Sequence, residues 1–304
     1  MDEMKLSGFT FVRNAVRLDY PVVESISSIL PIVDEFIVNV GPDEDGTLDL
    51  IRSIEDPKIK IIQSQWNPHM KTGYYVCSQQ TNIALFNCMG KWAFCLHPDE
   101  VIHEEDLPLI MAYINRYEKD DRVEGLALRE MNFWGDYKTI INVYPERQRR
   151  KCKIVKPHCF VLSRGDAAGF TVHPKYKERG RRIRIVDTKA RLFHYSVVKS
   201  EEGFKNKLQI FANYSGKNKN NYGWRDNFLY RKLPKQFLAP YQGNHPKVMS
   251  ERIRNHSISI DLSSVAEWRS TLTWRERWRF LKTLFVTYIT DRFSGRGSYK
   301  LLKR

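Results

Sequence analysis

The sequence has few cysteines and no pair of them at a metal-binding spacing. Five cysteines occur in 304 residues, and no two form a CxxC motif. An odd number without such a motif argues against both a disulfide framework and a structural zinc site. A reducing compartment is therefore the simplest interpretation.

Targeting and membrane-spanning segments are also missing. The first residues, MDEMKLSGFTF, begin acidic and lack a basic segment followed by a long apolar one, so no secretory signal is predicted. Spanning a bilayer takes roughly 18 consecutive apolar residues or more. The longest candidate near the C-terminus, residues 281–289, is shorter and is interrupted by Lys282. These absences predict a cytoplasmic protein.

Positive charge is abundant. The net charge of +15 predicts attraction to nucleic acid, anionic lipid or a phosphorylated substrate. Zinc-finger spacing, an RNP-like aromatic motif and a convincing helix-turn-helix are all lacking, and the basic residues are spread over both halves of the chain. The pattern therefore disfavours nucleic acid, although charge alone does not choose among polyanions.

The first hundred residues alternate between strand and helix patterns. Apolar, β-branched runs predict strands, and amphipathic runs between them predict helices. The predicted strands are residues 8–12, 35–40, 58–63 and 91–96, and the predicted helices are residues 21–30, 48–54 and 79–88. This alternation indicates a mostly parallel sheet covered on both faces. Ligands of such sheets bind beyond the carboxyl ends of the strands, where Arg13-Asn14, the loop from Gly41 and the stretch from His97 to Glu100 fall.

The buried-looking strand at residues 92–96 runs directly into His97-Pro98-Asp99-Glu100. Such carboxylates can simply favour the N-terminus of a following helix. Alternatively, their oxygens suit Mg²⁺ or Mn²⁺, which is useful where a phosphate is the leaving group. The segment alone leaves both interpretations open.

Three segments together resemble a known family. They are FTFVRNAV, SSILPIVDEFIVNVGPDEDGT and QQTNIALFNCMGKWAFCLHPDEVI. Their order and spacing over residues 7–110 are similar to the nucleotide-binding half of an inverting family 2 glycosyltransferase with a GT-A fold. RGDAAGF and LFHYSVVKS resemble, more weakly, segments around the acceptor region in a bacterial branch of that family.

The resemblance implies roles for residues of the first half. Asp99 falls on the metal-binding aspartate, and Glu100 is expected to support the loop. His97 stands where Asp or Gln is more usual, and Asn39 stands where many members have an aspartate that holds uridine or ribose. The residues expected to bind the nucleotide-sugar are Arg13, Asn14, Asn39, Gly41, Asp45, Asn82 and His97.

The implied reaction moves a sugar from a nucleotide-sugar to an acceptor hydroxyl. A carboxylate acts as general base, and a divalent cation, Mn²⁺ or Mg²⁺, carries the charge of the departing diphosphate. Asp166 is the first candidate base and Asp136 the second, although each could be an ordinary turn aspartate beside a glycine. His194 is expected near the metal or diphosphate, with a strand-end histidine as the alternative.

Phosphate or acceptor binding is expected of Lys199 and Arg181. The competing interpretation of Arg181 is a solvated basic face, because it belongs to the charge run KYKERGRRIRI.

The second half of the chain divides less clearly into strands and helices. Shorter strands are expected at residues 123–131, 139–144 and 159–163, and a further strand ends in ARLFHY. We expect a nucleotide-sugar-binding half at residues 1–120 and an acceptor-side half at residues 121–212. A loop-rich connection at residues 213–262 and a basic amphipathic helix at residues 263–304 follow.

Apolar residues recur near helical spacing in that last segment, with arginines between them. Its apolar stripe could pack on the rest of the protein, or it could lie on an anionic membrane with Trp at the interface and Arg toward the headgroups.

The fold class predicted from these features is α/β, with a GT-A type Rossmann-like mixed sheet, helices on both faces and a helical basic C-terminal extension. The function predicted is that of a cytoplasmic, membrane-peripheral glycosyltransferase of lipopolysaccharide or surface polysaccharide synthesis, acting on a glycan or glycolipid acceptor. The alternatives are a catalytically degenerate GT-A-like binding module and a basic nucleic-acid-binding protein.

Overall fold

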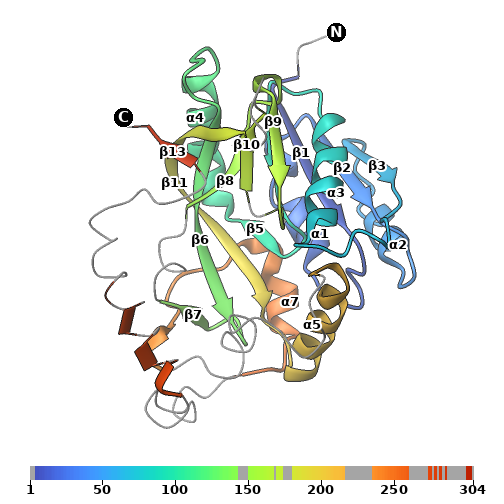
Figure 1. Cartoon of the computed structure of the whole chain (residues 1–304), viewed down its shortest axis with the longest axis vertical. Helices are drawn as coiled ribbons and strands as arrows, with labels where there is room; N and C mark the ends of the chain where they lie inside the picture. The colour runs from blue at the N-terminus through green and yellow to red at the C-terminus, as the bar shows by residue number, and fades with distance from the viewer. Residues whose placement is uncertain are drawn as a thin grey trace.

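The computed structural model describes most of the chain (Figure 1). The described residues are 4–142, 150–167, 169–173, 180–215, 235–259, 273–275, 277–278, 281–282, 285 and 299–302.

Four parallel strands form the first half of the sheet. They are β1 (Leu6–Val12), β2 (Glu35–Val40), β3 (Ile59–Gln63) and β4 (Trp92–Cys95), in the spatial order β3-β2-β1-β4. Every residue of β2 and β4 is buried. Strands buried on both faces read as continuous apolar runs, which is why the sequence predicts these four to within two residues at either end.

The second half of the sheet is mixed. Strand β8 (Arg150–Val155) lies antiparallel between β4 and β6 (Gly125–Trp134), and β6 pairs in parallel with the 17-residue β11 (Arg181–Val197). β10 (Gly169–Val172) and β9 (Val161–Arg164) continue the order beyond β11. Short strands complete it: β5 (Glu100–Ile102) and β13 (Tyr299–Leu301) on β11, and β7 (Thr139–Ile141) between β6 and β12 (Leu238–Pro240).

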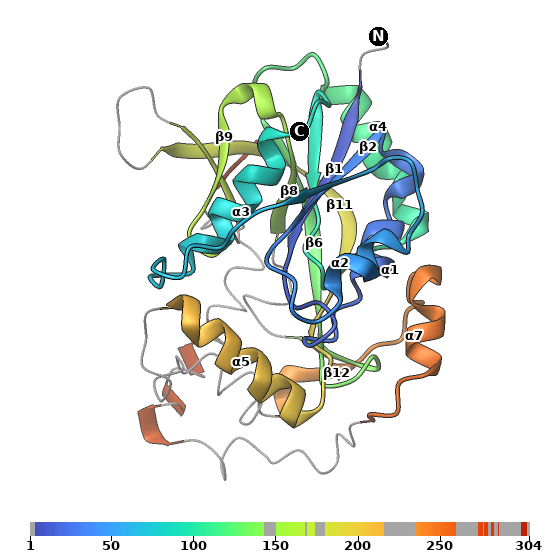
Figure 2. The same cartoon turned by 90° about the vertical axis from the view of Figure 1, so that its right-hand side faces the viewer.

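Helices cover both faces of the sheet (Figure 2). On one face, α1 (Val22–Ser27) and α4 (Leu107–Tyr117) bury Ile26, Ile110 and Ile114 against alternate strand residues such as Leu6. On the other face, α3 (Tyr75–Phe86) buries Leu85 beside Phe9. The fold prediction of a mixed α/β sheet with helices on both faces is therefore confirmed.

The remaining helices are short or lie at the sheet edge. They are α2 (Thr47–Arg52), α5 (Glu201–Ser215), α7 (Ser250–Arg254) and single 3-10 turns at Leu30–Ile32, Glu104–Asp106, Pro157–Cys159, Lys235–Phe237 and Lys247–Met249. Helix α5 lies below the sheet in Figure 2. Its Tyr214 and Lys207 contact Arg13 and Asp99, which follow the carboxyl ends of β1 and β4.

The structure adds elements that the sequence did not predict. Strand β8 and helices α4 and α5 are new, and β11 extends back into the basic run, to Arg181. The sheet is continuous from β4 through β8 to β6, so the two predicted halves at residues 1–120 and 121–212 share one sheet. Much of the predicted loop-rich connection and of the C-terminal helix lies outside the described residues.

Candidate functional site

An aromatic and basic cluster lies beyond the ends of β1 and β3. The Arg13 guanidinium carbon is 5.5 Å from the centre of the Trp66 ring, and Arg13 Nη1 donates a 3.2 Å hydrogen bond to the Tyr214 hydroxyl. The Trp66 ring centre is 5.3 Å from that of Tyr214 and 6.0 Å from that of Phe11. Flat rings beside a guanidinium are suited to stacking on a nucleobase. We call Phe11, Arg13, Trp66 and Tyr214 the aromatic cluster.

Gly41 lets Trp66 approach the backbone after β2. A Cβ atom at this position would lie 2.6 Å from Trp66 Nε1, which is closer than non-bonded atoms tolerate. The Gly41 N–H also donates to the Val12 carbonyl, at 2.8 Å, and so ties the β2 loop to β1. Glycine is therefore required here for close packing against Trp66, and the nucleotide-sugar contact predicted for Gly41 stays a prediction.

Five buried polar atoms near the ends of β1 to β4 have no hydrogen-bond partner among the described residues. An unpaired buried polar atom costs about 1–3 kcal/mol, so a group of them needs an explanation. Other such atoms lie elsewhere among the described residues, but these five share one edge of the sheet, where a polar ligand could pair with them. The atoms are Arg13 Nε, Asn14 Oδ1, Asn39 Oδ1, Trp66 Nε1 and His97 Nε2.

Other predicted nucleotide-binding residues hold the loops of this edge. Asn39 Nδ2 donates to the backbone oxygen and to Oε1 of Gln80, both at 2.9 Å. Asp45 Oδ2 accepts from the Arg17 N–H at 2.8 Å, and Oδ1 accepts from the Thr47 hydroxyl at 2.6 Å. Burial raises the pKa of Asp45, but these hydrogen bonds outweigh it and leave the pKa lowered.

Asn82 does not join the aromatic cluster through any described contact. Both ends of its amide bond to the backbone of Ser163, at 3.0 and 2.8 Å, and so fasten α3 to β9.

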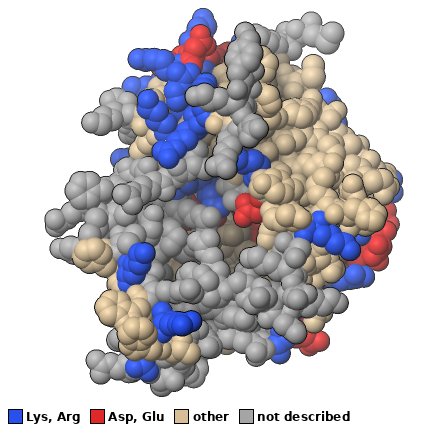
Figure 3. Space-filling model, in the orientation of Figure 1, with Lys and Arg blue, Asp and Glu red and all other residues tan. Residues whose placement is uncertain are grey.

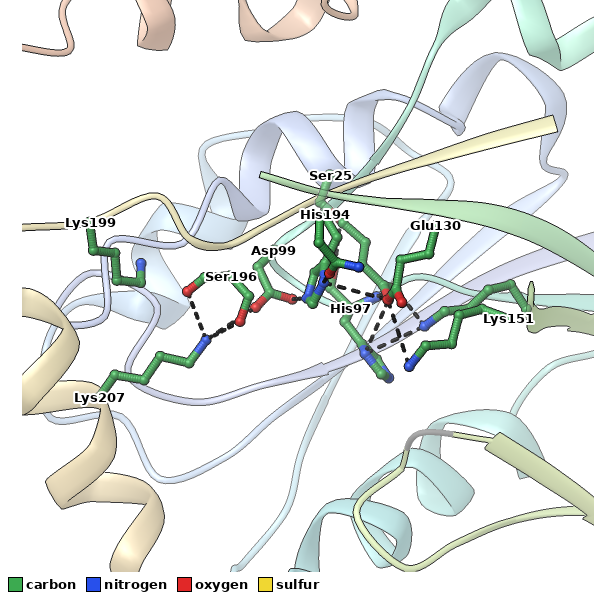
Figure 4. A network of polar contacts seen from close by, with 12 residues as sticks. Ser25, His97, Asp99, Glu130, Lys151, His194, Ser196, Lys199 and Lys207 are labelled. Carbon is green, nitrogen blue, oxygen red and sulfur yellow. Dashed lines mark hydrogen bonds and ion pairs between the residues drawn. The ribbon is translucent and has the colours of Figure 1, made fainter. Parts of the chain in front are cut away.

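A row of charged side chains begins at Asp99 (Figure 4). Asp99 Oδ2 is 3.4 Å from Lys207 Nζ, and Oδ1 is 3.6 Å from His194 Nε2. Lys207, on α5, also donates to the Ser196 hydroxyl at 2.5 Å. Although burial raises the pKa of Asp99, the positive charges of Lys207 and His194 hold it well below its usual range. Asp99 is therefore an anion held between Lys207 and His194.

Glu100 and His97 fold back on each other at the start of β5. Glu100 Oε2 accepts the His97 N–H at 2.8 Å and forms a 2.6 Å ion pair with Lys153, whose side chain is 3% exposed. Burial raises the pKa of Glu100, but the charges of His97 and Lys153 lower it to about 2. Burial lowers the pKa of His97 to about 4, so this imidazole is neutral near pH 7. The predicted supporting role of Glu100 agrees with these contacts.

The row continues through His194 to Glu130, a residue that the sequence did not indicate. His194 Nδ1 is 2.6 Å from Asn132 Oδ1 and 3.5 Å from Glu130 Oε1, so oxygens face both ring nitrogens. Lys151 Nζ is 3.6 Å from Glu130 Oε1. Burial lowers the pKa of His194, but the charges of Asp99 and Glu130 outweigh burial and raise it. These contacts favour the protonated form of His194 over the neutral form that a metal would need.

The divalent cation expected at Asp99 and His194 can be tested against these contacts. One ligand atom each from Glu100, Glu130 and His194 lies within 4.8 Å of the others, which is the spacing of a candidate metal cluster. Lysines nevertheless stand at Glu100, Glu130 and Asp99, where their positive charge would repel a cation. The described residues in this arrangement do not fit Mn²⁺ or Mg²⁺, whose presence stays a prediction.

The two predicted phosphate-binding residues occupy other positions. Lys199 is 4% exposed, and its Nζ donates to the backbone carbonyls of Leu18 and Asp19, so it holds the loop after β1. Arg181 forms an ion pair with Glu124, just before the start of β6, whereas Glu130 and Asn132 lie further along that strand. The structure thus brings Lys199 beside the site but does not bring Arg181 to it.

The two candidate bases differ in accessibility. Asp166 is exposed in the turn between β9 and β10, and the neighbouring Ala167 packs in the same cluster as Phe11 and Trp66. Asp136 is 2% exposed in the turn after β6, where its Oδ1 accepts the Lys138 N–H at 2.9 Å. Asp166 is therefore the candidate with access to the aromatic cluster.

Sequence reasoning missed Trp66, Glu130, Lys151, Lys153 and Lys207. A partial signal exists for the two lysines of β8, because alternate residues of a strand face the same side. Glu130 and Lys207 carried no such signal, since their neighbours are distant in sequence.

The described residues of the C-terminal segment expose an apolar stripe. Trp274, Trp278, Leu281 and Phe285 are helical, with exposed fractions of 72%, 58%, 47% and 65%. Their spacing of four, three and four residues is that of an apolar helix face. Arg275, Arg277 and Lys282 lie between them and are exposed as well. Among the described residues, no helix is long and apolar enough to cross a bilayer.

Comparisons with known proteins give a distant structural likeness and no sequence match. No family model and no curated protein matches the sequence. Similar solved structures include S. aureus TarS residues 1–349 alone, at 17% identity and a TM-score of 0.41, covering 77% of each chain. The same protein in complex with UDP-GlcNAc matches at 16% identity and a TM-score of 0.40, covering 77% of this chain and 78% of that chain. Likeness at this level transfers neither site residues nor an activity.

Proposed function

We propose that the protein is a nucleotide-sugar-dependent, inverting glycosyltransferase. The observation that carries this proposal is the gathering of unpartnered buried polar atoms with the aromatic cluster at the carboxyl edge of β1 to β4. Ligands of parallel sheets bind at this edge. The resemblance of residues 7–110 to the nucleotide-binding half of family 2 glycosyltransferases supports a nucleotide-sugar as that ligand.

Each part of the donor has a proposed partner. The nucleobase stacks at Trp66 and Tyr214 beside Arg13, and the ribose lies toward the loop at Gly41. The diphosphate points toward Asp99 and its neighbours. Asp166 is the proposed general base, because its side chain is exposed and can reach an acceptor, and the buried Asp136 is the second candidate.

The metal requirement predicted from the sequence can be tested at Asp99. A Mn²⁺ or Mg²⁺ ion that bound Asp99 would have to displace Lys207, which stands 3.4 Å from the carboxylate. Displacement of an ammonium from a carboxylate that is 11% exposed costs the ion pair and the Ser196 hydrogen bonds. Dependence of donor binding on an added cation tests this point directly.

The proposal for the acceptor rests on the exposed aromatic residues of the C-terminal segment and on the positive charge of the protein. Exposed Trp274 and Trp278 beside basic side chains suit the interface of an anionic membrane. This placement favours a glycolipid or glycan acceptor at the inner face of the cytoplasmic membrane, as in lipopolysaccharide or surface polysaccharide synthesis. On the face in Figure 3, the basic side chains stand in separate groups, which does not favour a nucleic-acid groove.

Isothermal titration with a panel of nucleotide-sugars, with and without Mn²⁺, tests the proposed function. We expect one nucleotide class to bind, and Arg13→Ala to weaken it about 3- to 30-fold, the range of a cation–π contact. Arg17→Ala is the matched control, because Arg17 is exposed in the same loop and should bind normally.

Binding without sugar transfer to any acceptor would favour a degenerate binding module. Tight, salt-sensitive nucleic-acid binding without nucleotide-sugar affinity would refute the proposal. For an active enzyme, NMR of the anomeric proton in the product decides whether the centre is inverted.

A further inference from the structure

The cation that contacts Asp99 in this structure is a side chain. Lys207 Nζ lies 3.4 Å from Asp99 Oδ2 and is positioned by Ser196, through its hydroxyl at 2.5 Å and its backbone carbonyl at 3.1 Å. Its side chain is 11% exposed and also lies 5.0 Å from the centre of the Tyr20 ring. The ammonium is thus held between Asp99 and Ser196 (Figure 4).

Each carboxylate in the row has its own lysine. Lys207 stands at Asp99, Lys153 at Glu100 and Lys151 at Glu130, at 3.4, 2.6 and 3.6 Å. His194 lies between Asp99 and Glu130. Three lysines match the three carboxylates, so the row has no excess of negative charge to attract a divalent cation.

Helix α5 connects this row to the aromatic cluster. Lys207 and Tyr214 are seven residues apart on α5, which places them on the same face of the helix and about 10 Å apart along its axis. Tyr214 contacts Trp66 and Arg13, and Lys207 contacts Asp99. One helix face therefore carries a group for the base and a cation for the phosphates of the same ligand.

We propose that Lys207 is the resident cation of the donor site, which binds the nucleotide diphosphate without a divalent metal. This inference rests on the proposed function. In the transfer step, the acceptor oxygen bonds to the anomeric carbon as the bond from that carbon to the diphosphate oxygen breaks. The bonding electrons leave with the diphosphate, and the acceptor proton passes to the base. Lys207 stays protonated and hydrogen-bonds to a phosphate oxygen.

Asp99 then acts as the positioning residue for Lys207 rather than as a metal ligand. It orients the ammonium, which would exchange one of its two Ser196 contacts for a phosphate oxygen when the ligand binds, and His194 contacts the same carboxylate from the other side.

The test measures binding of the best nucleoside diphosphate from UDP, GDP and ADP, by titration calorimetry in excess EDTA and in Mn²⁺. We expect the native protein to bind equally in both. Lys207→Ala should weaken binding in EDTA about 10- to 100-fold, the range of a charge-assisted hydrogen bond, and Lys207→Arg should restore most of it. Lys205→Ala is the control, because Lys205 is exposed on the same helix.

Several results would overturn the inference. Native binding that disappears in EDTA and returns with Mn²⁺, together with normal binding by Lys207→Ala, would show a metal site and leave the proposed function standing. Equal loss in the Ala and Arg variants with a lowered melting temperature would show a purely structural lysine. Absence of binding to every nucleotide and nucleotide-sugar in all conditions would remove the proposed function itself.

Discussion

The buried ion pair between Glu100 and Lys153 provides a prediction whose size follows from the structure. Their side chains are 1% and 3% exposed, and the charged atoms are 2.6 Å apart. The substitution Glu100→Gln keeps the shape but leaves the Lys153 ammonium buried beside His97, at 3.4 Å, without its carboxylate. Removal of one partner of a buried pair costs about 3–5 kcal/mol.

Thermal unfolding followed by circular dichroism measures this cost. One kcal/mol lowers the melting temperature of a domain of a few hundred residues by about 2–4 °C, so Glu100→Gln should lower it by roughly 6–20 °C at neutral pH. The double variant Glu100→Gln with Lys153→Met removes both charges and should recover most of that loss.

The same pair sets a dependence on pH. The folded-state pKa of Glu100 is lowered from 4.5 to about 2, so its contribution to stability is complete above about pH 4.5 and is lost as the pH falls toward 2. The difference in melting temperature between the native protein and Glu100→Gln should therefore shrink in acid. A double variant as unstable as the single one, or a difference that does not change with pH, would refute this reasoning.

Three further predictions follow from single contacts. Gly41→Ala should weaken nucleotide binding measured by calorimetry, because its Cβ would lie 2.6 Å from Trp66 Nε1 and displace the ring; unchanged affinity would contradict this. Burial, aided by the charge of a neighbouring lysine, lowers the pKa of Lys199 to about 7. Between pH 7 and about pH 10 only the unfolded chain holds the Lys199 proton, so the stability of the native protein relative to Lys199→Met should rise over this range. A difference in melting temperature that does not change with pH would contradict this prediction. Flotation with anionic liposomes should capture the native protein and not the double variant Trp274→Ala with Trp278→Ala, at unchanged melting temperature, and equal capture would refute membrane contact.

The parts of the site that lie on β1 to β4 could be predicted from local pattern. Each of these strands is an apolar run that ends in polar residues, and parallel strands place their carboxyl ends together. Arg13, Gly41 and Asp99 follow from that rule alone. That these three residues lie near one another can be predicted without the rest of the chain.

The other half of the site depends on pairings that local pattern does not encode. Glu130 and Asn132 reach His194 because β6 pairs in parallel with β11, with Asn132 opposite His194. The basic run gives no sign that Arg181 joins Glu124 at the other end of β6. Arg181 is exposed, as the alternative of a solvated basic face predicts, and it pairs with Glu124, while a lysine on α5 that the sequence did not single out lies beside Asp99.

The sequence predicts a metal ligand at Asp99, whereas in the structure its carboxylate contacts a lysine. The charges around Asp99 explain this difference. An aspartate after a buried strand is the expected ligand of a divalent cation only if the surrounding charges are negative. Here the residue two positions earlier is a neutral histidine, and lysines stand opposite Asp99, Glu100 and Glu130. Three lysines match these three carboxylates, so the row has no excess of negative charge for a metal to neutralise. A phosphate dianion beside Lys207 would meet its positive charge, whereas a divalent cation at Asp99 would have to displace it, and our proposal of direct diphosphate binding rests on this difference.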